Sequence, residues 1–146
     1  MKKISVILLL VLVSPLYAQV KVFPFKGSIL TTDQLGYYYE ITNTEINKYT
    51  VSGKLDCSYS NNLLGVIASV DVSNPQKVLV YFRDFTKILI LDNELAPTSD
   101  VIDLTDIELD ETSLVCRSYN DGVWYYDPVR FELIRKDQEL ETTNSS

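Results

Sequence analysis

Histidine is absent from this sequence of 146 residues, and cysteine, methionine and tryptophan together occur four times. Without histidine, a Ser–His or Cys–His catalytic pair is excluded, and a metal site of mixed cysteine and histidine ligands cannot be completed. The sequence also has no glycine-rich phosphate-binding loop. We therefore expect no cofactor and no bound metal.

Basic residues are also few, since 13 Lys and Arg stand against 20 Asp and Glu, for a formal charge of −7. Proteins that bind nucleic acid neutralise phosphates with clustered Lys and Arg, and this chain has no such cluster. The same argument applies to anionic membrane surfaces. We expect neither as a partner.

A long apolar run occurs only near the N-terminus. Lys2 and Lys3 are followed by apolar residues at positions 6–13 and by a small residue, Ala18. This is the pattern of a cleaved signal peptide, and the run is shorter than the roughly 20 residues that span a bilayer. We predict that residues 1–18 are removed and that the mature chain, with a charge of −9 and no membrane span, is secreted or periplasmic.

Two cysteines remain in the mature chain, Cys57 and Cys116. An even number of cysteines in an exported protein is compatible with a disulfide bond. The sequence leaves two possibilities open, a Cys57–Cys116 bridge or two buried free thiols.

An internal repeat organises the rest of the chain. Residues 69–95 align without a gap to residues 114–140 at an offset of 45, with Tyr81 on Tyr126 and Val78 on Val123. Residues 29–55 form a weaker copy at an offset of 40 from residues 69–95. The three copies end in SGKL, DNEL and DQEL, which are three versions of one turn.

Each copy predicts short β-strands. Runs rich in β-branched and aromatic residues alternate with turn-forming residues, as in β-hairpins. The expected strands are residues 37–41, 46–51, 66–72, 78–82, 87–91, 101–104, 113–117, 123–126 and 131–135. We place 101–104 ahead of the third unit and expect at most one helical turn, within residues 105–112.

Three or four antiparallel strands in 40 to 45 residues is the length of a β-propeller blade. On this period, and on the hairpin pattern at residues 88–95, the chain resembles the β-propeller-like proteins of exported bacterial proteomes, although it has no WD, kelch or Asp-box signature. The resemblance implies an all-β partial β-propeller of about three antiparallel blade-like repeats over residues 19–140, followed by a polar tail at 141–146.

Three blades do not close a ring, because propellers typically have four to eight. The sequence leaves three explanations open: an N-terminal piece of a longer protein, two self-associating chains in a six-unit ring, or an open stack of three sheets. The third unit contains Trp124, Tyr126 and Phe131 and does not have the polar outer face of a capping repeat. We therefore expect it to promote dimerisation or aggregation.

Two aromatic triplets, at residues 37–39 and 124–126, fall on equivalent predicted strands. They could stack on sugar rings, but alternate residues of a strand point to opposite faces, so part of each triplet is expected to pack between sheets.

Six acidic residues gather between positions 100 and 111. Their oxygens could bind calcium, but the spacing differs from that of an EF-hand loop, and a solvated loop explains the cluster equally well. These residues are Asp100, Asp103, Asp106, Glu108, Asp110 and Glu111.

Taken together, these features favour an exported, non-catalytic interaction or scaffold protein with a protein or glycan ligand. The alternatives are a secreted enzyme acting on polysaccharide through paired carboxylates, or a truncated gene product without a function of its own.

Export predicts a defined N-terminus. When the whole chain is expressed in a bacterial host, mass spectrometry of the secreted or periplasmic fraction should find a mature protein that begins at Gln19, because signal peptidase cleaves after a small residue such as Ala18. Full-length protein confined to the cytoplasm would contradict the prediction.

Overall fold

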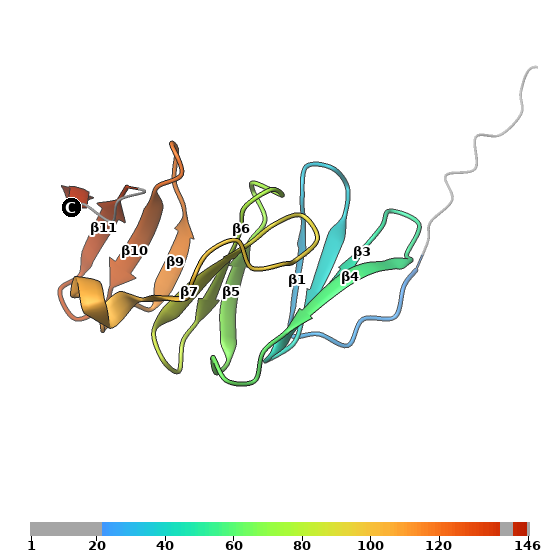
Figure 1. Cartoon of the computed structure of the whole chain (residues 1–146), viewed down its shortest axis with the longest axis horizontal. Helices are drawn as coiled ribbons and strands as arrows, with labels where there is room; N and C mark the ends of the chain where they lie inside the picture. The colour runs from blue at the N-terminus through green and yellow to red at the C-terminus, as the bar shows by residue number, and fades with distance from the viewer. Residues whose placement is uncertain (1–21, 138–141, 146) are drawn as a thin grey trace, which may run out of the picture.

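The computed structural model describes residues 22–137 and 142–145, so the predicted signal peptide at 1–18 lies outside the described part of the chain. The described residues form three four-stranded sheets that stand in a row, with the first and third sheets at its two ends (Figure 1). Within these residues, no helix has the length and apolarity needed to cross a membrane.

Each sheet is an antiparallel meander whose strands pair in chain order. The first sheet contains β1 (Ile29–Thr32), β2 (Tyr38–Ile41), β3 (Glu45–Tyr49) and β4 (Leu55–Ser60). The second contains β5 (Ile67–Asp71), β6 (Val78–Phe82), β7 (Lys87–Leu91) and β8 (Ile102–Asp103). The third contains β9 (Leu114–Arg117), β10 (Val123–Asp127), β11 (Glu132–Lys136) and β12 (Thr142–Ser145), and a 3-10 turn, η1 (Leu104–Ile107), precedes it. The predicted all-β architecture of antiparallel, blade-like repeats is confirmed.

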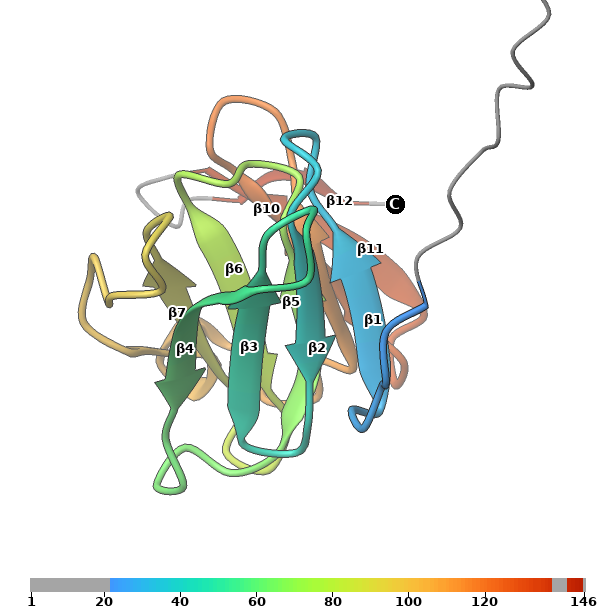
Figure 2. The same cartoon turned by 90° about the vertical axis from the view of Figure 1, so that its right-hand side faces the viewer.

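The sheets pack face to face, with the second sheet between the other two. Figure 2 looks onto the first sheet, with the second and third behind it. The first strands of the three sheets, β1, β5 and β9, lie on one side of the row and line a shared hollow of about 390 Å³. This is the relation between blades around a propeller axis.

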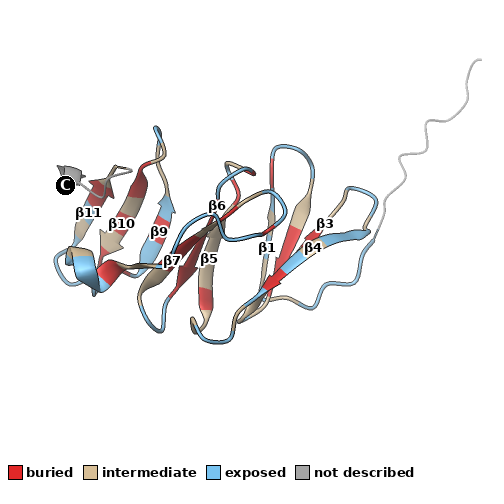
Figure 3. Cartoon of the chain, viewed as in Figure 1, coloured by how far each residue is buried: buried red, intermediate tan, exposed pale blue. Residues whose placement is uncertain are grey.

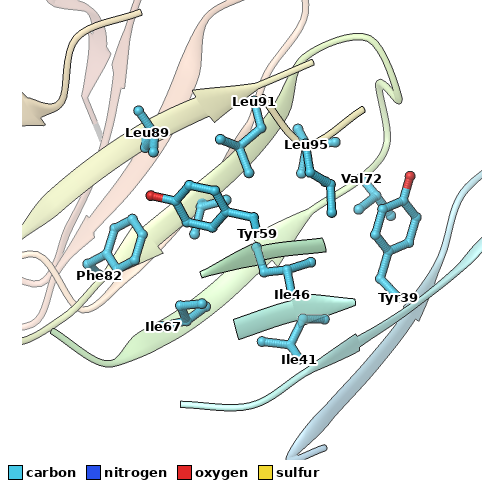
Figure 4. Packing of buried hydrophobic residues seen from close by; sticks show 12 residues of the cluster. Tyr39, Ile41, Ile46, Tyr59, Ile67, Val72, Phe82, Leu89, Leu91 and Leu95 are labelled. Atoms are coloured by element: carbon cyan, nitrogen blue, oxygen red, sulfur yellow. The ribbon is translucent and has the colours of Figure 1, made fainter. Parts of the chain in front are cut away.

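Strand alternation builds two hydrophobic cores, and β6 contributes to both because all five of its residues are buried. Val78, Val80 and Phe82 face the first sheet, whereas Leu79 and Tyr81 face the third. Figure 4 shows the first core, in which residues of the first sheet meet those of the second; the labelled residues are Tyr39, Ile41, Ile46, Tyr59, Ile67, Val72, Phe82, Leu89, Leu91 and Leu95. In Figure 3 the buried residues are concentrated in the central sheet, while β4 is largely exposed.

Aspartates hold the connecting turns. The Asp33 carboxylate accepts hydrogen bonds from the backbone N–H groups of Leu35 and Tyr37, at 2.9 and 3.0 Å. Asp92 does the same for Glu94 and Ala96, at 2.8 and 2.9 Å. Hydrogen bonds of this kind, from the backbone to a nearby side chain, are the reason that aspartate favours turns. Here they fix the turn between β1 and β2 and the turn that follows β7.

Two segments belong to other elements than the sequence analysis expected. Residues 101–104, expected ahead of the third unit, supply β8, which pairs with β7 and completes the second sheet. Residues 142–145, expected in the polar tail, form β12 and pair with β11. In both cases the sheet to which the segment belongs is decided by pairing to an existing strand edge, which the local sequence does not specify.

The difference in burial between two equivalent residues predicts different costs for matched truncations. Ile88, which is 1% exposed, lies opposite Tyr81, and Leu133, which is 41% exposed, lies opposite Tyr126. We expect Ile88→Ala to lower the free energy of unfolding by about 2–5 kcal/mol. Leu133→Ala should change it by less than about 1 kcal/mol. Urea unfolding of dilute mature protein measures both, and equal losses would contradict the assignment of the second core.

Candidate functional site

The outward face of the third sheet is apolar and lies at the end of the row. Its side chains stand in two cross-strand rows, set by the pairing of β10 with β9 and with β11. Because β10 alternates, Val123 and Tyr125 point into the second core, whereas Trp124 and Tyr126 point outward. We call this surface the open face; it consists of Leu114, Cys116, Trp124, Tyr126, Leu133 and Arg135.

The central cross-strand pair of the open face occupies core positions in the other two sheets. The cross-strand pair Tyr126–Leu133 is equivalent by register to Ile41–Ile46 in the first sheet and Tyr81–Ile88 in the second. In the first two sheets these residues are no more than 1% exposed. On the open face Leu133 is 41% and Leu114 64% exposed. Within residues 22–137, no sheet covers this repeated apolar surface.

The one charged side chain of the open face is held to its own sheet. The Arg135 guanidinium donates from Nε to the Ser118 hydroxyl and from an Nη to the Tyr119 carbonyl, both at 2.8 Å. It also lies 4.1 Å from the centre of the Tyr119 ring. Arg135 is only 4% exposed, so its charge does not project from the face.

The face at the opposite end of the row is mixed, because a polar row crosses it between the apolar side chains of Leu30, Tyr38 and Tyr49. Where the second and third sheets have Val80–Leu89 and Tyr125–Ile134, the first sheet has the pair Glu40–Asn47. Ser58 lies opposite Asn47 and continues the polar row onto β4. An apolar sheet packed on this face would bury the Glu40 carboxylate away from water.

An N-terminal strap, residues 22–27, lies across that face. The Glu40 carboxylate accepts hydrogen bonds from the Lys26 backbone N–H, from the Gly27 N–H at 2.9 Å and from the Tyr49 hydroxyl at 3.0 Å. The Lys26 N–H, followed by the other two donors, holds the pKa of Glu40 below its usual value, against the opposing effect of burial. The ionised Glu40 carboxylate therefore holds the strap in place.

Aromatic stacking completes the strap. The Phe23 ring stacks on Tyr38 with ring centres 5.7 Å apart, and Tyr38 stacks on Tyr49 at 4.9 Å. Gly53 has a φ of +87° and lies directly beneath the Phe23 ring, where a side chain would collide with it. A hollow of about 430 Å³ remains between the strap and the sheet.

Hydrogen bonds between the second and third sheets fix the orientation of the third. Asp71 on β5 accepts a hydrogen bond from the Arg117 N–H on β9 at 2.8 Å. Burial acts to raise the pKa of Asp71, but hydrogen bonds from Ser73 and Arg117 outweigh it and the pKa is lowered. The Arg117 side chain donates to the Lys77 carbonyl at 2.9 Å and to the Asp121 carboxylate at 3.2 Å.

The predicted site residues fall in separate places. Cys57 lies on β4 of the first sheet and Cys116 on β9 of the third, and in the structure both are free thiols. Partial burial raises the pKa of each thiol, and for Cys116 the nearby Asp71 carboxylate adds to the effect.

The aromatic triplets divide as strand alternation requires. Tyr39 and Tyr125 are fully buried between sheets, while Tyr38 belongs to the strap stack and Trp124 to the open face.

The acidic segment forms a cap and a loop. Asp103 accepts hydrogen bonds from the Thr105 backbone and hydroxyl and pairs with Lys87 at 3.3 Å. Among residues 22–137 and 142–145, no group of three Cys, Asp or Glu side chains is arranged to hold a metal ion.

Sequence reasoning missed the strap. The available signal was the polar pair Glu40–Asn47 at positions where the other two copies are apolar. To recognise that Glu40 and Asn47 are paired requires the register between β2 and β3, which the repeat alignment alone does not supply.

No protein-family model and no curated protein match the sequence. Solved structures do. A catalytically inactive virginiamycin B lyase from Staphylococcus aureus, solved with quinupristin, matches 80% of this chain and 39% of its own, with a TM-score of 0.59 and 12% identity. A streptogramin B lyase matches 88% of this chain and 42% of its own, with a TM-score of 0.56 and 12% identity.

The WD40 domain of Neurospora crassa Pan2 matches 91% of this chain and 41% of its own, with a TM-score of 0.53 and 11% identity. At such identity these likenesses show the fold alone, which is of the β-propeller type. The chain spans about two fifths of the length of each of these structures.

Strap docking should depend on pH through Glu40. Because the folded state lowers the pKa of this carboxyl from its usual value near 4.5, the strap is held fully above that pH and released as pH falls below it. In NMR spectra the Gly53 α-protons should be shifted upfield by the Phe23 ring at neutral pH and lose that shift on acidification. Glu40→Gln should reduce the shift at neutral pH and flatten its pH dependence, with Phe23→Ala as the unstacked reference. If the Gly53 α-proton shift of Glu40→Gln equals that of the unmodified protein at every pH, the result would contradict this role of Glu40.

Proposed function

We propose that this chain is an exported, non-catalytic interaction module that binds its partner through the open face of the third sheet. The observation that carries the proposal is the exposure of Leu133 at a position whose equivalents in the first two sheets, Ile46 and Ile88, are fully buried. Exposed apolar patches of this kind mark interaction sites in soluble proteins. The N-terminal sequence pattern supports export.

The face is built for recognition of another sheet. Tyr126 is flanked in register by Leu114 and Leu133, and Trp124 beside it by Cys116 and Arg135. Tryptophan and tyrosine are enriched among residues that dominate binding energy, because they bury a large area at little cost in conformational entropy. Asp71 and Arg117 hold β9 against the second sheet, so the face is presented on a fixed frame.

A non-catalytic role is supported by the chemistry that this chain lacks. The neighbouring virginiamycin B lyase was made catalytically inactive by a histidine-to-alanine change. The present chain has no histidine in its 146 residues, so it does not carry that chemistry. The likeness is one of framework, and a framework of this kind hosts many unrelated functions.

Site-specific photocrosslinking in cells that export the chain tests the proposal. A benzoylphenylalanine in place of Leu133 should give a discrete adduct, identified by peptide mapping, because the open face is covered by a partner. The same group in place of Leu63, which is 87% exposed on the loop between the first two sheets, is the matched control. Equal crosslinking at both positions, or none at position 133, would refute the open face as a binding surface.

A further inference from the structure

A polar hollow of about 370 Å³ lies between the first and second sheets, lined by strands β3 and β4 and by turns of both sheets. This volume is within the range of small-molecule sites. Its walls come from these two sheets alone, so the hollow does not depend on what covers the two outer faces of the row. Its polar side chains include Lys48, Asp56, Cys57, Gln76, Asn93 and Glu94.

A β-bulge in β4 directs a carboxylate toward this hollow. Lys48 on β3 pairs with Cys57 on β4. The next pair is Tyr49–Leu55, which leaves Asp56 as an extra residue with no partner on β3. In a regular strand Asp56 would point to the face opposite that of Cys57, but a bulge re-aims side chains. Here the Asp56 carboxylate lies 3.9 Å from the Lys48 ammonium, and both line the hollow.

The Lys48 ammonium has hydrogen-bond donors to spare at the hollow. It is 4% exposed and donates to the Asn93 carbonyl at 2.6 Å. The Asp56 oxygen at 3.9 Å is too far away for a hydrogen bond, and the Tyr37 ring, 4.3 Å away, makes a cation–π contact. An ammonium group has three N–H donors. Among residues 22–137 and 142–145, the Asn93 carbonyl is the one hydrogen-bond acceptor of Lys48, so a molecule in the hollow can supply a further one.

The charges of the lining favour a neutral ligand that carries hydroxyl groups. An anion would accept from Lys48 but would be repelled by Asp56 and Glu94, and a cation has no acceptor to offer the ammonium. A hydroxyl group both donates and accepts, so two adjacent hydroxyls satisfy the ammonium and a carboxylate together. The side-chain amides of Gln76 and Asn93 add further donors and acceptors.

We infer that this hollow binds a single sugar unit through adjacent ring hydroxyls. One hydroxyl accepts a hydrogen bond from the Lys48 ammonium, and its neighbour donates to the carboxylate of Asp56 or Glu94. The apolar side of the sugar ring lies against Leu35, which lines the hollow and is 60% exposed. This site is separate from the open face and does not rest on the proposed function.

The turns that carry the site are fixed before a ligand binds. Asp33 accepts a hydrogen bond from the Leu35 N–H at 2.9 Å, and Asp92 accepts one from the Glu94 N–H at 2.8 Å. Binding to a site that is already ordered costs less conformational entropy.

Alkylation of the two free thiols tests the inference within one molecule. Cys57 lines this hollow, whereas Cys116 lines the separate hollow beside β1, β5 and β9 and serves as the internal control. The mature protein is treated with iodoacetamide, with and without the methyl glycosides of glucose, galactose, mannose and N-acetylglucosamine. Concentrations reach about 100 mM, because small neutral ligands bind weakly. Peptide mass spectrometry measures the rate at each cysteine.

At least one glycoside should slow the alkylation of Cys57 by about threefold or more and leave Cys116 unchanged, because a bound sugar blocks access to the thiol. Glu94→Ala should weaken this glycoside's apparent affinity by about tenfold, the effect of losing one hydrogen bond to a charged group. Glu94 is exposed, so the variant should keep the fold. Glu111→Ala, a matched change at an exposed carboxylate outside the hollow, should leave the protection of Cys57 unchanged.

Four outcomes would overturn the inference. The first is that no glycoside protects Cys57, and the second is that Cys57 and Cys116 are slowed equally, which is a non-specific effect. The third is that the protection of Cys57 is the same in Glu94→Ala, which would place the sugar elsewhere. The fourth is that the amino acid alanine, a zwitterion, protects Cys57 while the glycosides do not, which would make the hollow a site for charged ligands.

Discussion

Packing of apolar sheet faces on one another is the interaction on which this structure depends. Each sheet is four strands of two to six residues, too small to be stable unless its faces are covered. The second sheet is the clearest case, because β6 sends Val80 into one core and Tyr81 into the other. The Tyr81 hydroxyl also donates to the Thr112 carbonyl at 2.5 Å, so this core residue ties the second sheet to the segment that leads into the third.

Because each sheet depends on packing against its neighbours, the repeat could be recognised in the sequence. The offset of 45 placed Tyr81 on Tyr126 and Val78 on Val123, and the structure places both pairs at equivalent points of β6 and β10. Repetition preserved the apolar residues because each unit meets the same demand, a neighbour on each face. Strand identity, the antiparallel pairing and the all-β class followed from that pattern.

The remaining features depend on contacts that local sequence does not encode. β8 is two residues long, and its assignment to the second sheet comes from the pairing of Ile102 with Ile88 across a long loop. The strap depends on donors at Lys26 and Gly27 reaching Glu40, which lies 13 to 14 residues away. The exposure of the open face could be expected from Trp124 and Tyr126, but the contrast with the strapped first sheet required the register of every strand.

The positive charge of Arg135 does not prevent a partner from covering the open face, because the equivalent residue of the first sheet is also a cation and is already buried. Arg135 lies opposite Trp124, and the equivalent residue opposite Tyr39 in the first sheet is Lys48. Lys48 is 4% exposed; its ammonium donates to the Asn93 carbonyl of the second sheet at 2.6 Å and lies 4.3 Å from the centre of the Tyr37 ring. The Asp56 carboxylate lies 3.9 Å from the same ammonium. A positive charge at this register is therefore accommodated between two sheets when a carbonyl, an aromatic ring and a carboxylate surround it. Arg135 has the carbonyl and the ring within its own sheet, both from Tyr119, so a covering sheet would meet a cation that is already held. The specificity of the open face then lies in the shape of Trp124, Tyr126 and Leu133.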